Sequence, residues 1–299
     1  MTDSLPLDAA LDPVDRLRAL LTLTPTERPG VFEAPSEWMV GGRIFGGQIL
    51  GQSVAAAING VDPDRVPSSL HTMFLQAGDV TEPVRYRVEL LHAGRSFSQL
   101  QVTATQSART LARSLVCFEI RSSGVDHQEV PPRLGSPQDV PSDSEALAAS
   151  TLPGAAESAA AVRYRSFETR HRPNSVYLQA QGGPGTDRQL VWMRTKTAFP
   201  GSQSLQRAAL AYASDYTILE PGMRRHGIAW AHPGLTRASL DHAIWFHRDV
   251  HVDAWCAYVQ RAPSAQEGRS LSAGSLYSED GILLATCAQE GVLRIPETR

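Results

Sequence analysis

The spacing of apolar residues along the chain predicts two successive series of secondary-structure elements. In the Ala-rich run 49–58, Leu50, Val54, Ala57 and Ile58 recur at helical spacing, which predicts a mostly buried helix. Period-two alternation bounded by turn residues predicts the strands that follow this helix. The elements of the first series are helices over 14–23 and 49–58 and strands over 70–75, 84–91, 96–105 and 111–120.

The same pattern restarts in the second part of the chain. Its elements are a helix over 204–219 and strands over 190–196, 238–246, 254–261, 271–277 and 282–293. Between the two series, Pro, Ser, Ala and Asp dominate and strand periodicity is lost, which is typical of a surface linker with one short helix near 145–149. We therefore predict an N-terminal helix and tail (1–30), a first domain (31–121), a linker (122–161) and a second domain (162–299).

Short motifs recur in the same order in both series. His71 precedes Gly94-Arg95-Ser96 by 23 residues, and His242 precedes Gly268-Arg269-Ser270 by 26 residues. Two copies are too few for a stacked repeat array, so the pattern indicates a duplication. One helix followed by antiparallel strands, twice, predicts an α+β fold in which each helix covers one sheet face and the two sheets pair side by side. Because His71 and His242 occupy matching positions, we expect both to serve the fold.

Composition and charge exclude several classes of protein. Hydrophobic residues make up 42% of the chain, enough for ordinary packed cores, and the net charge of −3 leaves no basic footprint for nucleic acid. The three cysteines form no CxxC pair, so neither a zinc site nor a disulfide framework is predicted. No apolar run approaches the roughly 20 residues that a membrane span needs, and the N-terminus lacks a secretory signal. We expect a cytoplasmic protein without a metal ion or cofactor.

An acidic residue on an apolar helix face is the strongest chemical signal. The series Leu205, Ala208, Tyr212, Asp215 and Leu219 follows steps of three and four along the predicted helix, which puts a carboxylate on the stripe that faces the sheet. Burying an unpaired carboxylate costs roughly several kcal/mol, so this group should have partners or a task. The alternative is a surface aspartate at the edge of the stripe.

Two further polar residues are weak signals by themselves. Ser239 lies near the start of a predicted strand, where hydroxyl groups are usually structural. Gln289 lies in the last strand, in phase with the apolar Ala285 and Cys287, and its amide therefore needs hydrogen-bond partners. Common hydrolase motifs, such as G-x-S-x-G and HExxH, are absent from the sequence.

Taken together, these segments resemble the bacterial acyl-CoA thioesterase II (TesB-like) family. The matching segments are 211–215, 239–248 and 285–291 in the second half and 45–52, 71–79 and 94–98 in the first half. The resemblance covers about 45–121 and 188–294 and implies a double hotdog fold, in which each antiparallel sheet wraps around a long central helix. It also implies an Asp, Thr/Ser, Gln triad, which falls on Asp215, Ser239 and Gln289. Residue 239 is Ser where bacterial relatives often have Thr.

The mechanism implied by the resemblance is direct attack of water on an acyl-CoA thioester. Asp215 would accept a proton from the water, while Ser239 and Gln289 would hold the water and the carboxylate in line. Two alternatives stay open. One is a non-catalytic acyl-CoA-binding protein, and the other is an enoyl-CoA hydratase using a His/Asp dyad. Asp241 and His242 are adjacent, but neighbouring side chains on a strand point to opposite faces.

Candidate substrate-binding residues lie at helix starts and turns. Gly47 and Gln48 open the first predicted long helix, and Arg95 and Arg269 follow glycines at the repeated turns, where they would meet CoA phosphates. Exposed sheet faces suggest a homo-oligomer, either a dimer or a tetramer.

Overall fold

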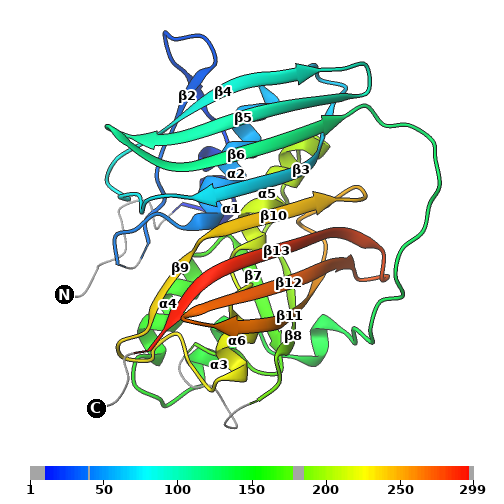
Figure 1. The fold of residues 1–299 in the computed structure, drawn as a ribbon. Helices are drawn as coiled ribbons and strands as arrows, with labels where there is room; N and C mark the ends of the chain where they lie inside the picture. The colour runs from blue at the N-terminus through cyan, green and yellow to red at the C-terminus, as the bar shows by residue number, and fades with distance from the viewer. Residues whose placement is uncertain (1–10, 40, 178–184, 296–299) are drawn as a thin grey trace.

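A single antiparallel sheet runs through the molecule. The computed structural model describes residues 11–39, 41–177 and 185–295, and within these ranges the sheet has 13 strands in the order β1-β2-β4-β5-β6-β3-β10-β13-β12-β11-β8-β7, with β9 pairing beside β13 (Figure 1). The strands are β1 (Thr24–Pro25), β2 (Val31–Ala34), β3 (Val66–Phe74), β4 (Val84–Ala93), β5 (Phe97–Gln106), β6 (Arg109–Glu119), β7 (Phe167–Arg172), β8 (Arg188–Thr195), β9 (Thr236–Ser239), β10 (Asp241–Phe246), β11 (Cys256–Gln266), β12 (Arg269–Ser278) and β13 (Leu283–Arg294). The helices are α1 (Pro13–Leu20), α2 (Gly46–Ile58), α3 (Asp143–Ala148), α4 (Ala155–Tyr164), α5 (Gln203–Ser214) and α6 (Glu220–Arg225), with a 3₁₀ turn η2 (Pro137–Asp139).

The two halves of the sheet have the same strand order and meet at their matching strands. The first half ends in β5-β6-β3 and the second begins in β10-β13-β12, and β3 pairs with β10 in antiparallel register, with Leu70 opposite Ile244. This pairing removes one open edge from each half. The predicted double hotdog, with its two sheets side by side, is therefore confirmed.

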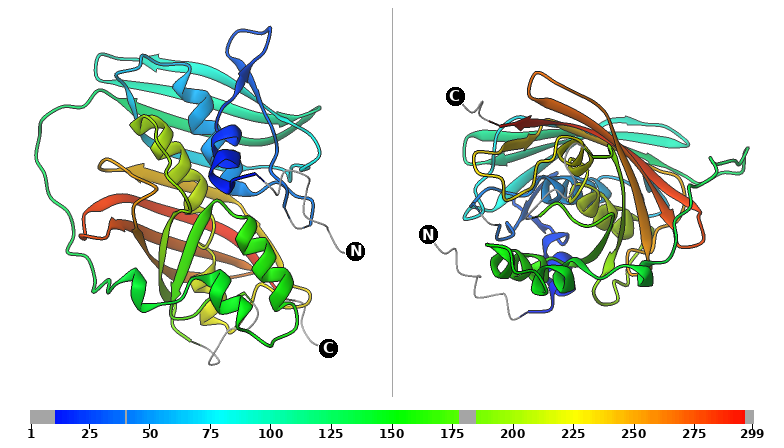
Figure 2. Two further views of the ribbon diagram at one scale, coloured as in Figure 1. Left: turned by 180° about the vertical axis from the view of Figure 1, so that it is seen from behind. Right: turned by 90° about the horizontal axis from the view of Figure 1, so that it is seen from below.

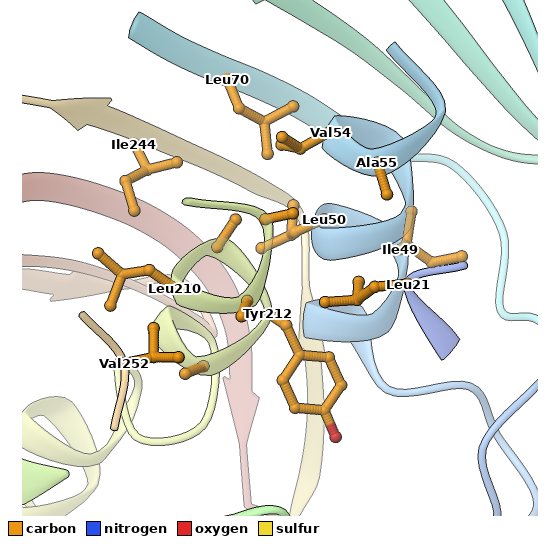
Figure 3. Packing of buried hydrophobic residues seen from close by; sticks show 14 of the residues in the cluster. Leu21, Ile49, Leu50, Val54, Ala55, Leu70, Leu210, Tyr212, Ile244 and Val252 are labelled. Carbon is orange, nitrogen blue, oxygen red and sulfur yellow. The ribbon is translucent and has the colours of Figure 1, made fainter. Parts of the chain in front are cut away.

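The two central helices lie against each other on the same face of the sheet (Figure 2). Leu50 and Val54 of α2 share one buried core with Leu210 of α5 and with Leu70 and Ile244 of the joined strands (Figure 3). Along most of their length both helices are buried on all sides, as expected for helices enclosed by a curved sheet.

Glycines let α2 and α5 approach closely. A Cβ atom at Gly47 would come 2.2 Å from the main-chain oxygen of Tyr212, and one at Gly51 would come 3.0 Å from that of Ala208. A larger residue at position 47 would push the helices apart, because the obstacle is backbone, which cannot rotate away. The close approach brings the N-terminus of α2 to the C-terminal end of α5.

Two predicted elements of the second half are each divided in two. The helix predicted over 204–219 stops at Ser214, with Asp215 as its C-cap, and a separate helix α6 starts at Glu220. Pro221 lies in the first turn of α6, where its missing N–H is tolerated, but it would break a continuous helix. The strand predicted over 238–246 is split into β9 and β10 on either side of Leu240.

The stretch predicted as a linker is more structured than expected. It carries α3, which confirms the short helix near 145–149, and most of α4, so the predicted boundary after residue 161 falls inside a helix. The buried positions of α4 include Ala155, Ala159 and Val162, and small alanine side chains give a weak apolar stripe. No helix of the described residues combines the length and apolarity of a membrane span.

Candidate active site

A cavity of about 920 Å³ lies where the two halves meet. The start of α2, the end of β3, the helix α4, the end of α5 and the strand β9 all contribute to its walls. Asp215 and Ser239 line this cavity together with Gly46 of the first half. Both copies of the duplication therefore build one cavity.

The three predicted triad residues lie together. Asp215 is only 9% exposed, and the Ser239 hydroxyl lies 3.3 Å from Asp215 Oδ1, to which it donates a hydrogen bond. Gln289 Nε2 donates to Ser239 Oγ at 2.9 Å, and the Gln289 side chain also hydrogen bonds to Asp215. Three elements, α5, β9 and β13, thus deliver a carboxylate, a hydroxyl and an amide to one point.

The first half contributes the N-terminus of α2 to this point. The main-chain N–H of Gly47 donates a hydrogen bond to Asp215, and the N-cap residue Phe45 supplies no side-chain cap. The first-turn amides of a helix have no intrahelical acceptor and carry the positive end of its dipole. A Cβ atom at Gly46 would lie 2.5 Å from Asp215 Oδ2, so only glycine leaves room for the carboxylate.

Burial sets the proton affinity of Asp215. Loss of solvent raises the pKa of this carboxyl from 3.8 to about 6, although hydrogen bonds from Gln289, Gly47 and Ser239 act in the opposite direction. The group is ionised at neutral pH but holds a proton far more readily than an exposed aspartate. A carboxylate with this pKa, facing a cavity, is suited to accept a proton from water.

The adjacent pair Asp241 and His242 does not form the acid/base dyad of a hydratase. Nδ1 of His242 faces Gln289 Oε1 at 2.5 Å and Nε2 faces Ser214 Oγ at 3.0 Å, while Asp241 accepts from the main-chain N–H of Glu290 at 2.8 Å. Both ring nitrogens of His242 therefore bond to partners other than Asp241.

The four predicted substrate-binding residues have different surroundings. Gly47 bonds to Asp215, whereas Gln48 is buried and accepts from the main-chain N–H of Glu37 at 2.9 Å, which supports the segment before α2. Arg95 lies exposed at the turn before β5, and Arg269, at the start of β12, is ion-paired with Glu267 and Glu290. Neither arginine is among the cavity-lining residues, and their contact with CoA phosphates stays a prediction.

Three other arginines line the cavity, and no sequence pattern singled them out. Arg43 and Arg237 are exposed, and Arg165 is half-buried over the ring of Tyr216, with its guanidinium carbon 4.9 Å from the ring centroid. The ion pairs within the described ranges involve other arginines. The cavity thus combines aromatic walls with positive charge, which suits a substrate that is apolar at one end and anionic at the other.

Two family models match the two halves of the chain. The model described as "Acyl-CoA thioesterase N-terminal domain" matches residues 34–119, and the model described as "Acyl-CoA thioesterase" matches residues 162–292. The second match contains Asp215, Ser239 and Gln289.

Individual relatives match over nearly the whole chain. The chain is 33% identical to "Acyl-CoA thioesterase 2" of Haemophilus influenzae, over 89% of this chain and 93% of that protein. It is 32% identical to human "Acyl-coenzyme A thioesterase 8", over 95% and 92% of the two chains. Among solved structures, the acyl-CoA thioesterase II TesB2 of Mycobacterium marinum superposes with a TM-score of 0.74 at 30% identity, over 95% of this chain and 99% of that one.

Proposed function

This chain belongs to the acyl-CoA thioesterase II family of thioester hydrolases, and from that premise we propose that Asp215 is the general base that activates water against the thioester of a fatty acyl-CoA. The observation that carries the proposal is the contact of one buried, cavity-facing carboxylate with Ser239 and Gln289. Ser239 and Gln289 hold the water and the carboxylate in line, and the thioester carbonyl lies in the cavity.

The reaction needs no covalent enzyme intermediate. A water molecule adds through its oxygen to the acyl carbon and gives one proton to Asp215. The tetrahedral intermediate then expels the CoA thiolate, and the proton on Asp215 passes to the thiolate or to solvent. A thiolate is a good leaving group, so the step that most needs catalysis is the addition of water, which requires an activated water molecule and a stabilised oxyanion. General base catalysis supplies typically ~10²–10⁴-fold of rate.

The N-terminus of α2 is the natural place for the developing oxyanion. Gly46 lines the cavity beside the carboxylate, and its main-chain N–H belongs to the first helical turn, where amides have no intrahelical acceptor. An amide of this kind, together with the helix dipole, stabilises negative charge on a carbonyl oxygen. The first half therefore supplies the electrophilic part of the site, and the second half supplies the base.

The anionic part of CoA fits the charged rim of the cavity. Arg43 and Arg237 are exposed cavity-lining cations, and Arg237 is braced by Trp230, with its guanidinium carbon 4.8 Å from the ring centroid. Guanidinium groups bind phosphate oxygens well because their N–H donors form a planar fork. The apolar and aromatic walls of the cavity, which include Phe45 and Tyr216, accommodate the acyl chain.

One assay distinguishes this activity from the two alternatives. Purified protein is given saturated and 2-enoyl-CoA substrates of several chain lengths, and free thiol is measured with a chromogenic disulfide while enoyl absorbance is followed in parallel. We expect thiol release from the saturated substrates. Loss of enoyl absorbance without thiol release would indicate a hydratase, and substrate binding without either change would indicate a non-catalytic binder.

A further inference from the structure

A buried histidine connects to the triad from the side away from the cavity. We propose that His242 is a positioning residue that, together with Ser214, fixes the direction of the Gln289 amide and thereby aims the Ser239 hydroxyl at Asp215. The inference rests on the proposed function and adds a residue pair that the triad does not contain.

The hydrogen bonds form a closed ring. Nε2 of His242 lies 3.0 Å from Ser214 Oγ, and Nδ1 lies 2.5 Å from Gln289 Oε1. Gln289 Nε2 donates to Ser239 Oγ at 2.9 Å, and Ser239 donates to Asp215 Oδ1 at 3.3 Å. Ser214 and Asp215 are consecutive residues, so the ring returns to the end of α5, where it starts.

The protons in this ring can be arranged in one productive direction. Burial lowers the pKa of His242 to about 4, although its hydrogen bond to Gln289 Oε1 acts in the opposite direction, so the imidazole is neutral and carries a single N–H. If that hydrogen is on Nδ1, it donates to Gln289 Oε1, and the amide nitrogen must then face Ser239. The Ser239 oxygen accepts this bond, which leaves its own hydrogen for Asp215.

The opposite orientation of the Gln289 amide would weaken the hydrogen bond from Ser239 to Asp215. With the amide of Gln289 turned over, its oxygen would face Ser239 and would compete with Asp215 for the single hydroxyl hydrogen. Ser214 opposes this outcome, because its hydroxyl can donate to Nε2 of His242 and so keep the ring hydrogen on Nδ1. The same hydroxyl donates to the main-chain oxygen of Ala211 at 2.8 Å, so in the productive arrangement its hydrogen is shared between that oxygen and Nε2 of His242.

The residues of the first half that correspond to His242 do not form an imidazole network. Thr72 lies directly opposite His242 across the β3–β10 pairing and is equally buried, but it joins Ser114 and Ser53 in a chain of hydroxyl groups with spacings of 2.8 and 3.2 Å. His71, which matches His242 in the sequence motif, is exposed and packs edge-on against Trp245. The two motif histidines therefore do not share one structural role, and the imidazole network accompanies only the half that carries Asp215.

The test compares variants of His242 in the full chain. His242→Phe keeps an aromatic ring but removes both ring nitrogens, so we expect kcat to fall roughly 10–100-fold, by analogy with the loss of a partner that orients a metal-binding side chain, with KM little changed. His242→Asn restores an N–H donor near the position of Nδ1 and should recover most of this loss. His247→Asn, which alters an exposed histidine that follows β10 and bonds to Thr286, is the matched control and should leave kcat unchanged.

A pH profile separates positioning from simple packing. When Ser239 no longer donates to the carboxylate, the charged form of Asp215 is less stable, so the rising limb of kcat against pH should move to higher pH in His242→Phe but not in His247→Asn. Ser214→Ala removes the donor to Nε2 with little change in volume, and it should shift the limb in the same direction even if His242→Phe does not fold.

Two results would overturn the inference. One is an unchanged kcat and pH limb in His242→Phe and Ser214→Ala. The other is an equal loss in His242→Asn and His242→Phe with the pH limb unmoved, because this would show that only ring volume matters. Either result could be found together with an inactive Asp215→Asn variant. In that case Asp215 would remain the general base, and only the proposed role of His242 would be rejected.

Discussion

At the scale of single residues, the site depends on a carboxylate placed where apolar side chains are expected. Helical spacing identified Asp215 as the anomaly, and the family resemblance added Ser239 and Gln289, which the structure brings into contact with it. Gly46 escaped prediction because its contribution is a main-chain amide and the absence of a side chain. We expected His242 to have only a structural role because it matches His71 in the repeated motif, but such a match does not report which face of a strand each side chain occupies.

The raised pKa of Asp215 predicts the pH dependence of hydrolysis. Only the ionised carboxylate can accept a proton from water, so kcat/KM should rise with pH through about 6 and level off above it. In Ser239→Ala the loss of one hydrogen bond to the charged form should move this limb to higher pH. Initial rates from pH 4.5 to 8.5 provide the measurement, and a wild-type kcat/KM that is already level at pH 5 would contradict the raised pKa of the buried carboxylate.

At the scale of elements, two helix ends create the site. The end of α5 places Asp215, and the start of α2 meets it with free amides. Pattern analysis predicted both helices but ran α5 on to Leu219, because the apolar stripe continues past the C-cap Asp215 as far as the N-cap of α6. Helix ends depend on capping and on tertiary contacts, which periodicity alone does not report.

The substitution Gly46→Ala tests the contact between these two helix ends. The added methyl group would lie 2.5 Å from Asp215 Oδ2, so the carboxylate must move while every polar group of the site is retained. We expect kcat to fall roughly 10²-fold, the size of effect that a displacement of about 1 Å can cause. Gly124→Ala, at a position with no neighbouring atom within 4 Å, is the matched control and should keep wild-type rates. Wild-type turnover in Gly46→Ala would contradict the geometry.

At the scale of the whole molecule, the two copies of the duplication build one cavity together, because residues of both halves line it. The sequence predicted two copies and side-by-side sheets, and the β3–β10 pairing confirms both. The register of that pairing was beyond prediction, since it is set by how the two cores pack. The former linker is also part of the architecture, because α3 and α4 pack together and α3 is fastened to the second half.

A buried ion-pair cluster fastens α3 to β7 and α6. His171 lies 2.8 Å from Asp143 and 2.7 Å from Glu220, and all three side chains are almost fully buried. Burial alone would lower the pKa of His171, but the two carboxylates outweigh it and raise this pKa to about 10. No strand was predicted over β7, because it has only one apolar residue, Phe167, and no apolar alternation, although its side chains alternate between buried and half-buried.

This cluster predicts a loss of stability in alkali. Because the pKa of His171 is higher in the folded state than in the unfolded chain, its contribution is fully present below about pH 6.5 and declines as pH rises towards 10, with a slope approaching ~1.4 kcal/mol per pH unit. Asp143→Asn removes one carboxylate and lowers the folded-state pKa of His171, so the decline should still begin near pH 6.5 but end at lower pH and be smaller in total. Denaturant unfolding at pH 7, 8, 9 and 10 checks both expectations, and identical pH dependence in the two proteins would contradict a charged His171.

The most direct test of the account is single-turnover hydrolysis of a bound acyl-CoA by Asp215→Asn. The substitution keeps the size of the side chain and replaces a buried charge with a neutral amide, so folding and acyl-CoA affinity should be preserved. We predict that the rate falls by ~10²–10⁴-fold while the dissociation constant measured on the same preparation stays close to that of the wild type. Near wild-type hydrolysis by a correctly folded Asp215→Asn would contradict the assignment of Asp215 as the base.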